Sequence, residues 1–228
     1  DRVYTEPYND ERGRNRVFPP IADFVKEKLY EDQGLHCEVA KLKMDFMTRA
    51  QSLIHGDLHT GSIFINEEST KVFDPEFCFY GPMGYDIGNV IANMIFAWAN
   101  GDAAGAADFC KWVEDVLVDV INMTKEKMEK YYDEHVTDTM CRNELYKKYY
   151  MDTIIEDTSA VAGLELIRRI VGMANVKDIT TIADEAKRAR AEKICITAAI
   201  DFIKNRSDKK CGKCFLKTLK DAIAEVDA

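Results

Sequence analysis

The strongest constraint on the fold is one stretch, residues 53–88, in which short apolar segments alternate with loops rich in acidic residues and glycine. Residues 63–65 are β-branched or aromatic, residues 66–69 are typical of a turn, and residues 72–73 are apolar again. This pattern predicts a hairpin of two short strands. A hairpin sets the segments at its two ends side by side, so this stretch brings together residues from both flanks.

The two flanks of the predicted hairpin carry carboxylates. Asp57 precedes the first strand, and Asp74 and Glu76 follow the second. Carboxylates gathered around one cavity repel each other and normally need a cation between them, and hard oxygen ligands suit Mg²⁺. Pro75 removes a backbone donor and fixes φ, so we expect an extended loop there. An aspartate that can accept a hydroxyl proton beside a Mg²⁺ site is typical of enzymes that catalyse phosphoryl transfer.

These acidic loops carry a family resemblance. A His-Gly-Asp element followed some seventeen residues later by an apolar-Asp-x-Glu element resembles the catalytic and metal-binding loops of the protein-kinase-like small-molecule kinases. Within that group, the chain most closely resembles the S-methyl-5-thioribose kinases. The matching segments are EPYN at 6–9, HGDLHTGS at 55–62, DPEF at 74–77, GPMGYDIG at 81–88 and GLELIRRIVG at 163–172.

One difference from the protein-kinase-like small-molecule kinases supports the resemblance to the thioribose kinases. The wider group has a metal-binding asparagine after the catalytic aspartate, and Ser62 stands at that position here. The thioribose kinases use a glutamate in the Asp-Pro-Glu element in its place, and Glu76 matches it. The resemblance therefore implies that Asp74 and Glu76 hold Mg²⁺, and that Asp74, Pro75 and Glu76 form the cofactor-binding segment for ATP.

The resemblance implies an activity, which is ATP-dependent phosphorylation of the C1 hydroxyl of 5-methylthioribose in methionine salvage. Asp57 is then the catalytic residue and also binds the substrate, because it orients the hydroxyl. Arg168 and Arg169 are expected to contact the substrate or the phosphate in transit, with Arg168 the first choice. A cytoplasmic homodimer is also implied.

Local readings of the same residues remain open. Asp57 is also typical of an Asx turn. The alternative for Arg168 and Arg169 is an ion pair with Glu165 or a core aspartate, since unpaired guanidinium groups are costly in an apolar helix. Asp86 caps the next helix, or holds the backbone of the catalytic loop as the resemblance implies, or does both.

Three other functions remain as alternatives. The first is another sugar, aminoglycoside or choline kinase lobe, and the second is a non-catalytic binding module of the same fold. The third is a metallohydrolase, because His55, Asp57 and His59 alternate as transition-metal ligands on a strand would. The chain has only four histidines, and such sites usually need three or more ligands, so we expect His55 instead to be buried and hydrogen-bonded to backbone.

Composition narrows the possible partners. The hydrophobic content of 46% is ample for a core, and 31 basic against 40 acidic residues give a net charge of −9, which argues against nucleic acid or an anionic membrane as partner. No stretch reaches the length of about 18 uninterrupted apolar residues that a spanning helix needs. Seven cysteines, an odd number, suit reduced thiols in a cytosolic protein. Cys211 and Cys214 form a single CxxC, which we interpret as coincidental.

The remainder of the chain has helical periodicity, so the predicted fold class is α+β and mainly α-helical: the C-terminal lobe of the protein-kinase-like fold, with a small β-hairpin that carries the catalytic and metal loops. Residues 17–228 are predicted to be the catalytic, substrate-binding lobe. No Gly-rich phosphate loop followed by a strand lysine is found in the sequence, so residues 1–16 are predicted to be a linker from an N-terminal lobe. The first predicted helix begins at Pro19-Pro20. The other predicted helices span 39–53, 87–99, 109–121, 125–134, 144–169, 179–204 and 214–226. The helix 144–169 has a possible break at 157–159.

Overall fold

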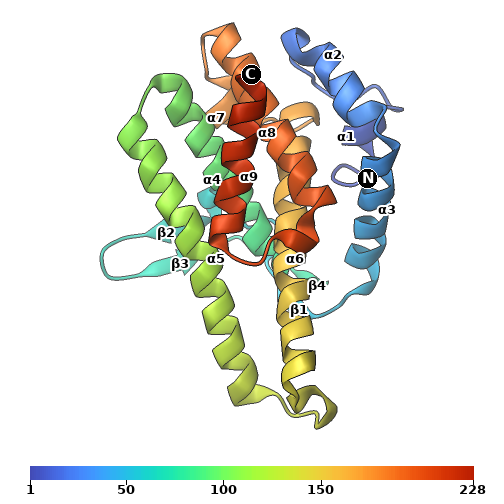
Figure 1. Ribbon diagram of the computed structural model, residues 1–228, viewed down its shortest axis with the longest axis vertical. Helices are drawn as coiled ribbons and strands as arrows, with labels where there is room; N and C mark the ends of the chain where they lie inside the picture. The colour runs from blue at the N-terminus through green and yellow to red at the C-terminus, as the bar shows by residue number, and fades with distance from the viewer.

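The computed structural model describes all residues from 1 to 228. It is mainly α-helical with four short strands, which confirms the predicted fold class (Figure 1). The helices are α1 (Glu6–Asn9), α2 (Ala22–Val25), α3 (Gln33–Thr48), α4 (Gly84–Ala104), α5 (Ala107–His135), α6 (Glu144–Val171), α7 (Lys177–Thr180), α8 (Glu185–Lys204) and α9 (Gly212–Val226); the strands are β1 (Ser52–Ile54), β2 (Ile63–Ile65), β3 (Thr70–Val72) and β4 (Phe79–Gly81).

The long helices pack around one apolar core. Helix α4 contacts α5, α6 and α8, while α9 covers α5 and α8. The main cluster of 38 buried side chains runs through all of these helices and through α3. A separate small cluster, formed by Ile54, Tyr85 and Val161, lies where β1 meets α4 and α6. Figure 1 shows the β2–β3 hairpin projecting on the side of α5, with α1, α2 and α3 on the other side. None of the helices combines the length and apolar character that crossing a membrane requires.

The predicted hairpin is confirmed. Strands β2 and β3 are antiparallel, with Ile63 opposite Val72 and Ile65 opposite Thr70. The side chain of Asn66 accepts hydrogen bonds from the backbone N–H groups of the next turn residues, Glu68 and Ser69, which is how asparagine stabilises a tight reversal.

Strand β1 was not predicted. The periodicity of residues 39–53 predicts a helix that runs into the His-Gly-Asp loop, but α3 ends at Thr48. Residues 52–54 instead pair antiparallel with β4, Ser52 opposite Gly81 and Ile54 opposite Phe79. The hydrogen bonds of this second strand pair override the helical pattern, because an apolar residue every three or four positions does not encode a partner 25 to 29 residues away.

Helix α6 continues through the possible break at 157–159. The hydroxyl of Thr158 donates to the carbonyl of Ile154 at 2.9 Å, and that of Ser159 donates to the carbonyl of Phe202 on α8 at 2.8 Å. Both buried hydroxyls therefore have partners without interrupting the helix. Helix α5 is likewise continuous where the sequence predicts the separate helices 109–121 and 125–134.

The predicted helix 179–204 is divided. A short helix, α7, ends at Thr180, and α8 begins after Asp184. The Asp184 carboxylate accepts hydrogen bonds from the backbone N–H groups of Ala186 and Lys187 at 2.9 and 3.0 Å. An aspartate in this position is a strong N-cap, so the local capping preference sets the start of α8.

Residues 1–16 lie against the helical core. Tyr4 and Tyr8 are buried members of the core cluster, and the backbone N–H of Arg16 donates to the carbonyl of Val171 at the end of α6 at 2.8 Å. The buried carboxylate of Glu6 accepts a hydrogen bond from Nε of Arg14 at 3.0 Å. This segment is thus ordered by the same helices that form the rest of the core.

Candidate active site

The His-Gly-Asp loop follows β1, and Gly56 determines its shape. Gly56 has a φ of +86°, a conformation that glycine adopts readily and other residues rarely. A Cβ atom at this position would lie 2.2 Å from the carbonyl oxygen of Phe77. The backbone that carries Asp57 therefore lies directly against the segment that follows Glu76.

Asp86 fixes this loop from helix α4. Its two carboxylate oxygens accept hydrogen bonds from the backbone N–H groups of His55 at 2.6 Å and Gly56 at 3.0 Å. The expectation that Asp86 holds the backbone of the His-Gly-Asp loop is confirmed. The alternative, that it caps the helix, is wrong, because α4 begins at Gly84 and Asp86 lies within its first turn.

The Asp-Pro-Glu segment returns to the same loop. Nε2 of His55 lies 2.8 Å from the carbonyl oxygen of Phe73, and Gly56 lies against Phe77. Both ends of the segment 74–76 are thus anchored on the His-Gly-Asp loop, and its side chains are exposed to solvent. The pairing of His55 with backbone is as predicted, although its ring is only half-buried and not fully buried.

Asp74 has an unusual backbone conformation. Its φ is +66°, in the left-handed region that costs a non-glycine residue about 1–3 kcal/mol and is enriched at functional sites. Pro75 follows in an irregular segment outside any strand, as expected from its fixed φ and missing donor. The anchors at Phe73 and Phe77 hold the strained residue in place.

Two arginines from α6 meet Asp57. Its Oδ1 lies 3.4 Å from Nη2 of Arg168 and 3.9 Å from Nη2 of Arg169. Successive helical residues point about 100° apart, and the sequence therefore left open whether both reach one ligand. Their long side chains overcome that divergence and converge on one carboxylate oxygen.

Glu165 orients both arginines. Its side chain is buried, and its Oε2 lies 2.6 Å from Nε of Arg168 while its Oε1 lies 2.7 Å from Nε of Arg169. Burial alone would lower the pKa of Arg168, but the attraction of Glu165 raises it above its usual range, so the guanidinium stays charged. The pairing with Glu165 is therefore present together with the contact to Asp57. Two carboxylates and two guanidinium groups balance in charge.

One further ion pair lies behind the site and is not predicted from the sequence. Arg49, between α3 and β1, places Nη1 2.8 and 2.6 Å from the two carboxylate oxygens of Asp157 on α6. Burial raises the pKa of Asp157 to about 6, although the attraction of Arg49 opposes this. The pair links the start of β1 to the helix that carries the two arginines. Asp157, a charged residue within the apolar stretch of α6, is the sequence feature that could have predicted this ion pair.

The alternating His55, Asp57 and His59 do not assemble as a transition-metal site. The His55 ring is bonded to the Phe73 carbonyl, and Nε2 of His59 lies 3.3 Å from the hydroxyl of Ser62. No group of three or more His, Cys, Asp or Glu side chains is placed to hold a metal ion. Ser62 is itself buried, so its hydroxyl supports His59.

Asp74 and Glu76 fit a Mg²⁺ ion by the chemistry of their donors. Both are exposed carboxylates on one short segment whose two ends lie against the His-Gly-Asp loop. Mg²⁺ usually takes one or two protein carboxylates and completes its shell with phosphate oxygens and water. Two carboxylates without a third protein ligand therefore match the way this ion is held beside a nucleotide.

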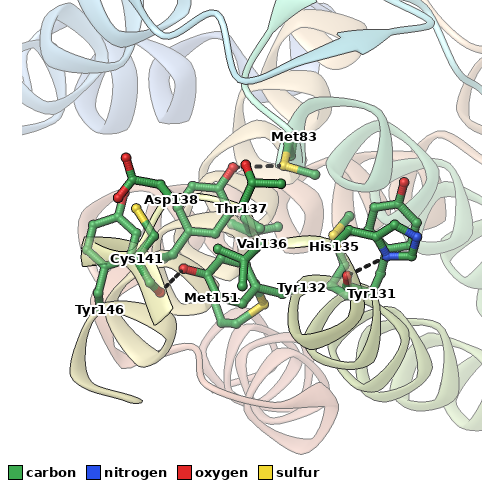
Figure 2. Close-up of a pocket in the computed structure, with 13 residues that line it drawn as sticks. Met83, Tyr131, Tyr132, His135, Val136, Thr137, Asp138, Cys141, Tyr146 and Met151 are labelled. Carbon is green, nitrogen blue, oxygen red and sulfur yellow. Dashed lines mark hydrogen bonds between the residues drawn. The ribbon is translucent and has the colours of Figure 1, made fainter. Parts of the chain in front are cut away.

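A separate apolar cavity lies away from these residues. It has a volume of about 390 Å³ and lies between the second half of α5 and the first half of α6. Figure 2 shows Tyr131, Tyr132, Tyr146 and Met151 around it, with Met83 at its edge. None of the predicted site residues lines it, so the candidate active site is the open surface around Asp57 and not this cavity.

Comparison with known proteins gives consistent matches. Residues 4–117, which are half of the chain and include Asp57, Asp74, Glu76 and Asp86, match the model of the phosphotransferase enzyme family. Methylthioribose kinase 1 of Oryza sativa subsp. japonica is 37% identical over 223 residues, covering 90% of this chain and 51% of the relative.

Bacterial relatives bear the same name. Methylthioribose kinase of Escherichia coli O45:K1 is 33% identical over 220 residues, covering 90% of this chain and 52% of the relative. Methylthioribose kinase of Bacillus pumilus is 35% identical over 202 residues, covering 89% of this chain and 50% of the relative. The chain spans about half the length of these curated relatives.

The matches agree with the architecture. A helical body in which a small hairpin carries the His-Gly-Asp and Asp-Pro-Glu loops corresponds to the C-terminal lobe of the protein-kinase-like fold, as the sequence predicts. The strand pair that presents Asp57 and the helix that presents Asp86 both lie inside the matched range. This chain belongs to the phosphotransferase enzyme family.

Proposed function

We propose that this chain is the catalytic, substrate-binding lobe of a kinase that transfers the γ-phosphoryl group of ATP to the C1 hydroxyl of 5-methylthioribose. The relatives named methylthioribose kinase support the choice of substrate. The observation that carries the proposal is the convergence of Arg168 and Arg169 on Asp57, since it places positive charge beside the residue that would hold the acceptor hydroxyl.

Each predicted site residue has a role in this proposal. Asp57 orients the C1 hydroxyl and accepts its proton as the oxygen attacks. Arg168 and Arg169 balance the negative charge that the phosphoryl group carries during transfer. Asp74 and Glu76 would hold Mg²⁺, which when bound would supply positive charge to stabilise the phosphate groups of ATP. Pro75 keeps the two carboxylates on an irregular segment.

The wider organisation remains part of the proposal. Because the relatives are about twice as long as this chain, the complete activity is proposed for a protein in which residues 17–228 work with an ATP-binding N-terminal lobe, joined through residues 1–16. A cytoplasmic location, a homodimeric state and the absence of nucleic-acid and membrane partners are likewise proposed. Sedimentation of the purified protein would test the dimer.

Phosphate transfer from ATP tests the function directly. The protein containing both lobes is assayed with 5-methylthioribose, with ribose and an aminoglycoside as competing acceptors. We expect turnover with 5-methylthioribose that falls about 10²- to 10⁴-fold in Asp57→Asn, the range for loss of general acid–base catalysis. Asp23→Asn, an exposed acid on α2, is the matched control and should keep full activity.

Two results would separate the alternatives. Turnover with an aminoglycoside or ribose in preference to 5-methylthioribose would transfer the assignment to another small-molecule kinase. Folded protein without turnover on any acceptor would favour a binding module.

Removal of Mg²⁺ by a chelator should abolish transfer, and Asp74→Asn and Glu76→Gln should each raise the Mg²⁺ concentration needed for half-maximal rate.

A further inference from the structure

The sulfur atoms of Cys211 and Cys214 lie in contact at the start of α9. Their Sγ atoms are 3.3 Å apart, so a disulfide requires them to approach by only about 1.3 Å. Both residues are half-buried, so neither is enclosed in the core. The other five cysteines have no such neighbour: Cys110 and Cys195 are buried, and Cys37, Cys78 and Cys141 lie apart on other segments.

The backbone around this pair is already in place. Cys211 is the residue before α9, and its carbonyl accepts a hydrogen bond from the N–H of Cys214 at 2.9 Å. The N–H of Gly212 donates to the Asn122 side chain on α5 at 2.9 Å, and a Cβ on Gly212 would lie 2.3 Å from the carbonyl of Val118. The turn is therefore packed tightly on α5, and the short movement of the two sulfurs falls to the side chains.

Neighbouring lysines hold the same turn on two other helices. Lys209 pairs with Asp201 on α8 at 2.6 Å, and Lys210 pairs with Glu156 on α6 at 3.0 Å. Lys213 lies exposed between the two cysteines. Burial opposes ionisation of Cys214, but hydrogen bonds from the backbone of Lys210 and from Cys211 outweigh it and lower the pKa of this thiol. A lowered pKa and access to solvent are what make a thiol reactive.

We propose that Cys211 and Cys214 form a reversible dithiol–disulfide pair that a low-molecular-weight disulfide oxidises. The Cys214 thiolate attacks one sulfur of the small disulfide, forms a mixed disulfide and releases the first thiolate. Cys211, once deprotonated, attacks Sγ of Cys214, forms the Cys211–Cys214 bond and releases the second thiolate. The two released thiolates take up the two protons, so the protein loses two electrons and the small disulfide gains them.

The sequence supplies a direct readout. Trypsin cleaves after Lys210, Lys213 and Lys217, so it cuts between the two cysteines. The oxidised protein therefore yields peptides 211–213 and 214–217 joined by a disulfide, and the reduced protein yields them separately. Mass spectrometry after incubation in glutathione buffers and trapping with an alkylating reagent measures the ratio of the two forms.

We expect the linked peptides to rise from near zero to more than half of the total as glutathione disulfide replaces glutathione, and to disappear with dithiothreitol. Cys211→Ser should stop at glutathione attached to Cys214, because the resolving thiol is gone. Cys37→Ser, which removes an exposed thiol on α3, should leave the linkage unchanged. The proposal is overturned by a lasting glutathione adduct on Cys214 in the parent protein, or by absence of the linked peptides in every buffer.

Discussion

Oε2 of Glu165 lies 2.6 Å from Nε of Arg168, whose Nη2 lies 3.4 Å from Oδ1 of Asp57. Glu165 and Arg168 are three residues apart on α6, a spacing that places both side chains on one helix face. Nη2 of Arg168 also donates to Oε1 of Glu165 at 3.2 Å, so the buried carboxylate and Asp57 contact the same guanidinium nitrogen. Arg169 is held by Oε1 of the same carboxylate, so one residue orients both positive charges.

The first prediction concerns this bridging carboxylate. Glu165→Gln keeps the shape of the side chain but removes the charge that two guanidinium groups share. We expect phosphate transfer to fall about 10- to 100-fold, equivalent to about 1.4–2.7 kcal/mol, and the unfolding free energy to fall by about 3 kcal/mol, because a buried pair is broken. Steady-state kinetics and urea unfolding measure the two effects.

Glu156→Gln is the matched control on the same helix. Its partner is the partly exposed Lys210, and such pairs contribute about 0–1 kcal/mol. Equal losses in the two variants would show that Glu165 contributes no more than an ordinary surface charge.

The second prediction concerns Gly56. Gly56→Ala combines a positive φ with a Cβ atom 2.2 Å from the Phe77 carbonyl. Gly105→Ala shares the positive φ, at +74°, but meets no atom within 4 Å. We expect Gly105→Ala to lower the unfolding free energy by about 1 kcal/mol through backbone strain, and Gly56→Ala to lower it by a further 1–3 kcal/mol through overpacking.

Only Gly56→Ala should also impair phosphate transfer, because it displaces the loop that carries Asp57. Denaturant unfolding and kinetics on both variants provide the comparison. Similar stability and full activity in the two would contradict the close approach of the Asp-Pro-Glu segment to the His-Gly-Asp loop.

The third prediction concerns Asp86. Asp86→Asn replaces one acceptor oxygen by an NH₂ group, which cannot accept from the backbone N–H of His55 or Gly56. A hydrogen bond to a charged group contributes about 1.5–3 kcal/mol, and we expect the unfolding free energy to fall by that amount. Phosphate transfer should fall by at least tenfold, because the backbone of the catalytic loop loses an anchor. Unchanged kinetics would show that Asp86 is dispensable for holding the loop.

The fourth prediction is a pH dependence from Asp157. Burial raises the pKa of Asp157 to about 6 in the folded chain, against an ordinary value of 3.8. The folded state therefore binds more protons than the unfolded state between about pH 4 and 6, so the contribution of this group is fully present below pH 4 and is lost as the pH rises through 6. The loss is about 3 kcal/mol.

Unfolding free energies at pH 4, 5, 6 and 7 measure this effect. The difference in stability between the parent protein and Asp157→Asn should shrink as the pH rises across this interval. A difference that grows with pH would mean that the attraction of Arg49 and not burial controls the carboxyl. Asp45 and Glu156, which also act on Asp157, are kept in both proteins.

Several local features follow from the amino-acid sequence alone. Residues 63–72 form a hairpin because β-branched and aromatic residues flank an asparagine turn, and that preference acts over a few positions. The same pattern predicts that Asp57 lies on one flank of the hairpin and Asp74 and Glu76 on the other. Asp184 could have been recognised as an N-cap by the same local logic.

The tertiary structure decided which distant residues act together. Strand β1 exists because β4 supplies its hydrogen-bonding partner, α6 stays intact because Ser159 donates to the carbonyl of Phe202, and Glu165 bridges two arginines that face Asp57, 108 positions before it in the chain. Hydropathy periodicity records which face of an element is buried, but not what it is buried against. Contacts between segments far apart in the chain depend on how the helices pack, so the orientation of the site emerges only in the folded chain.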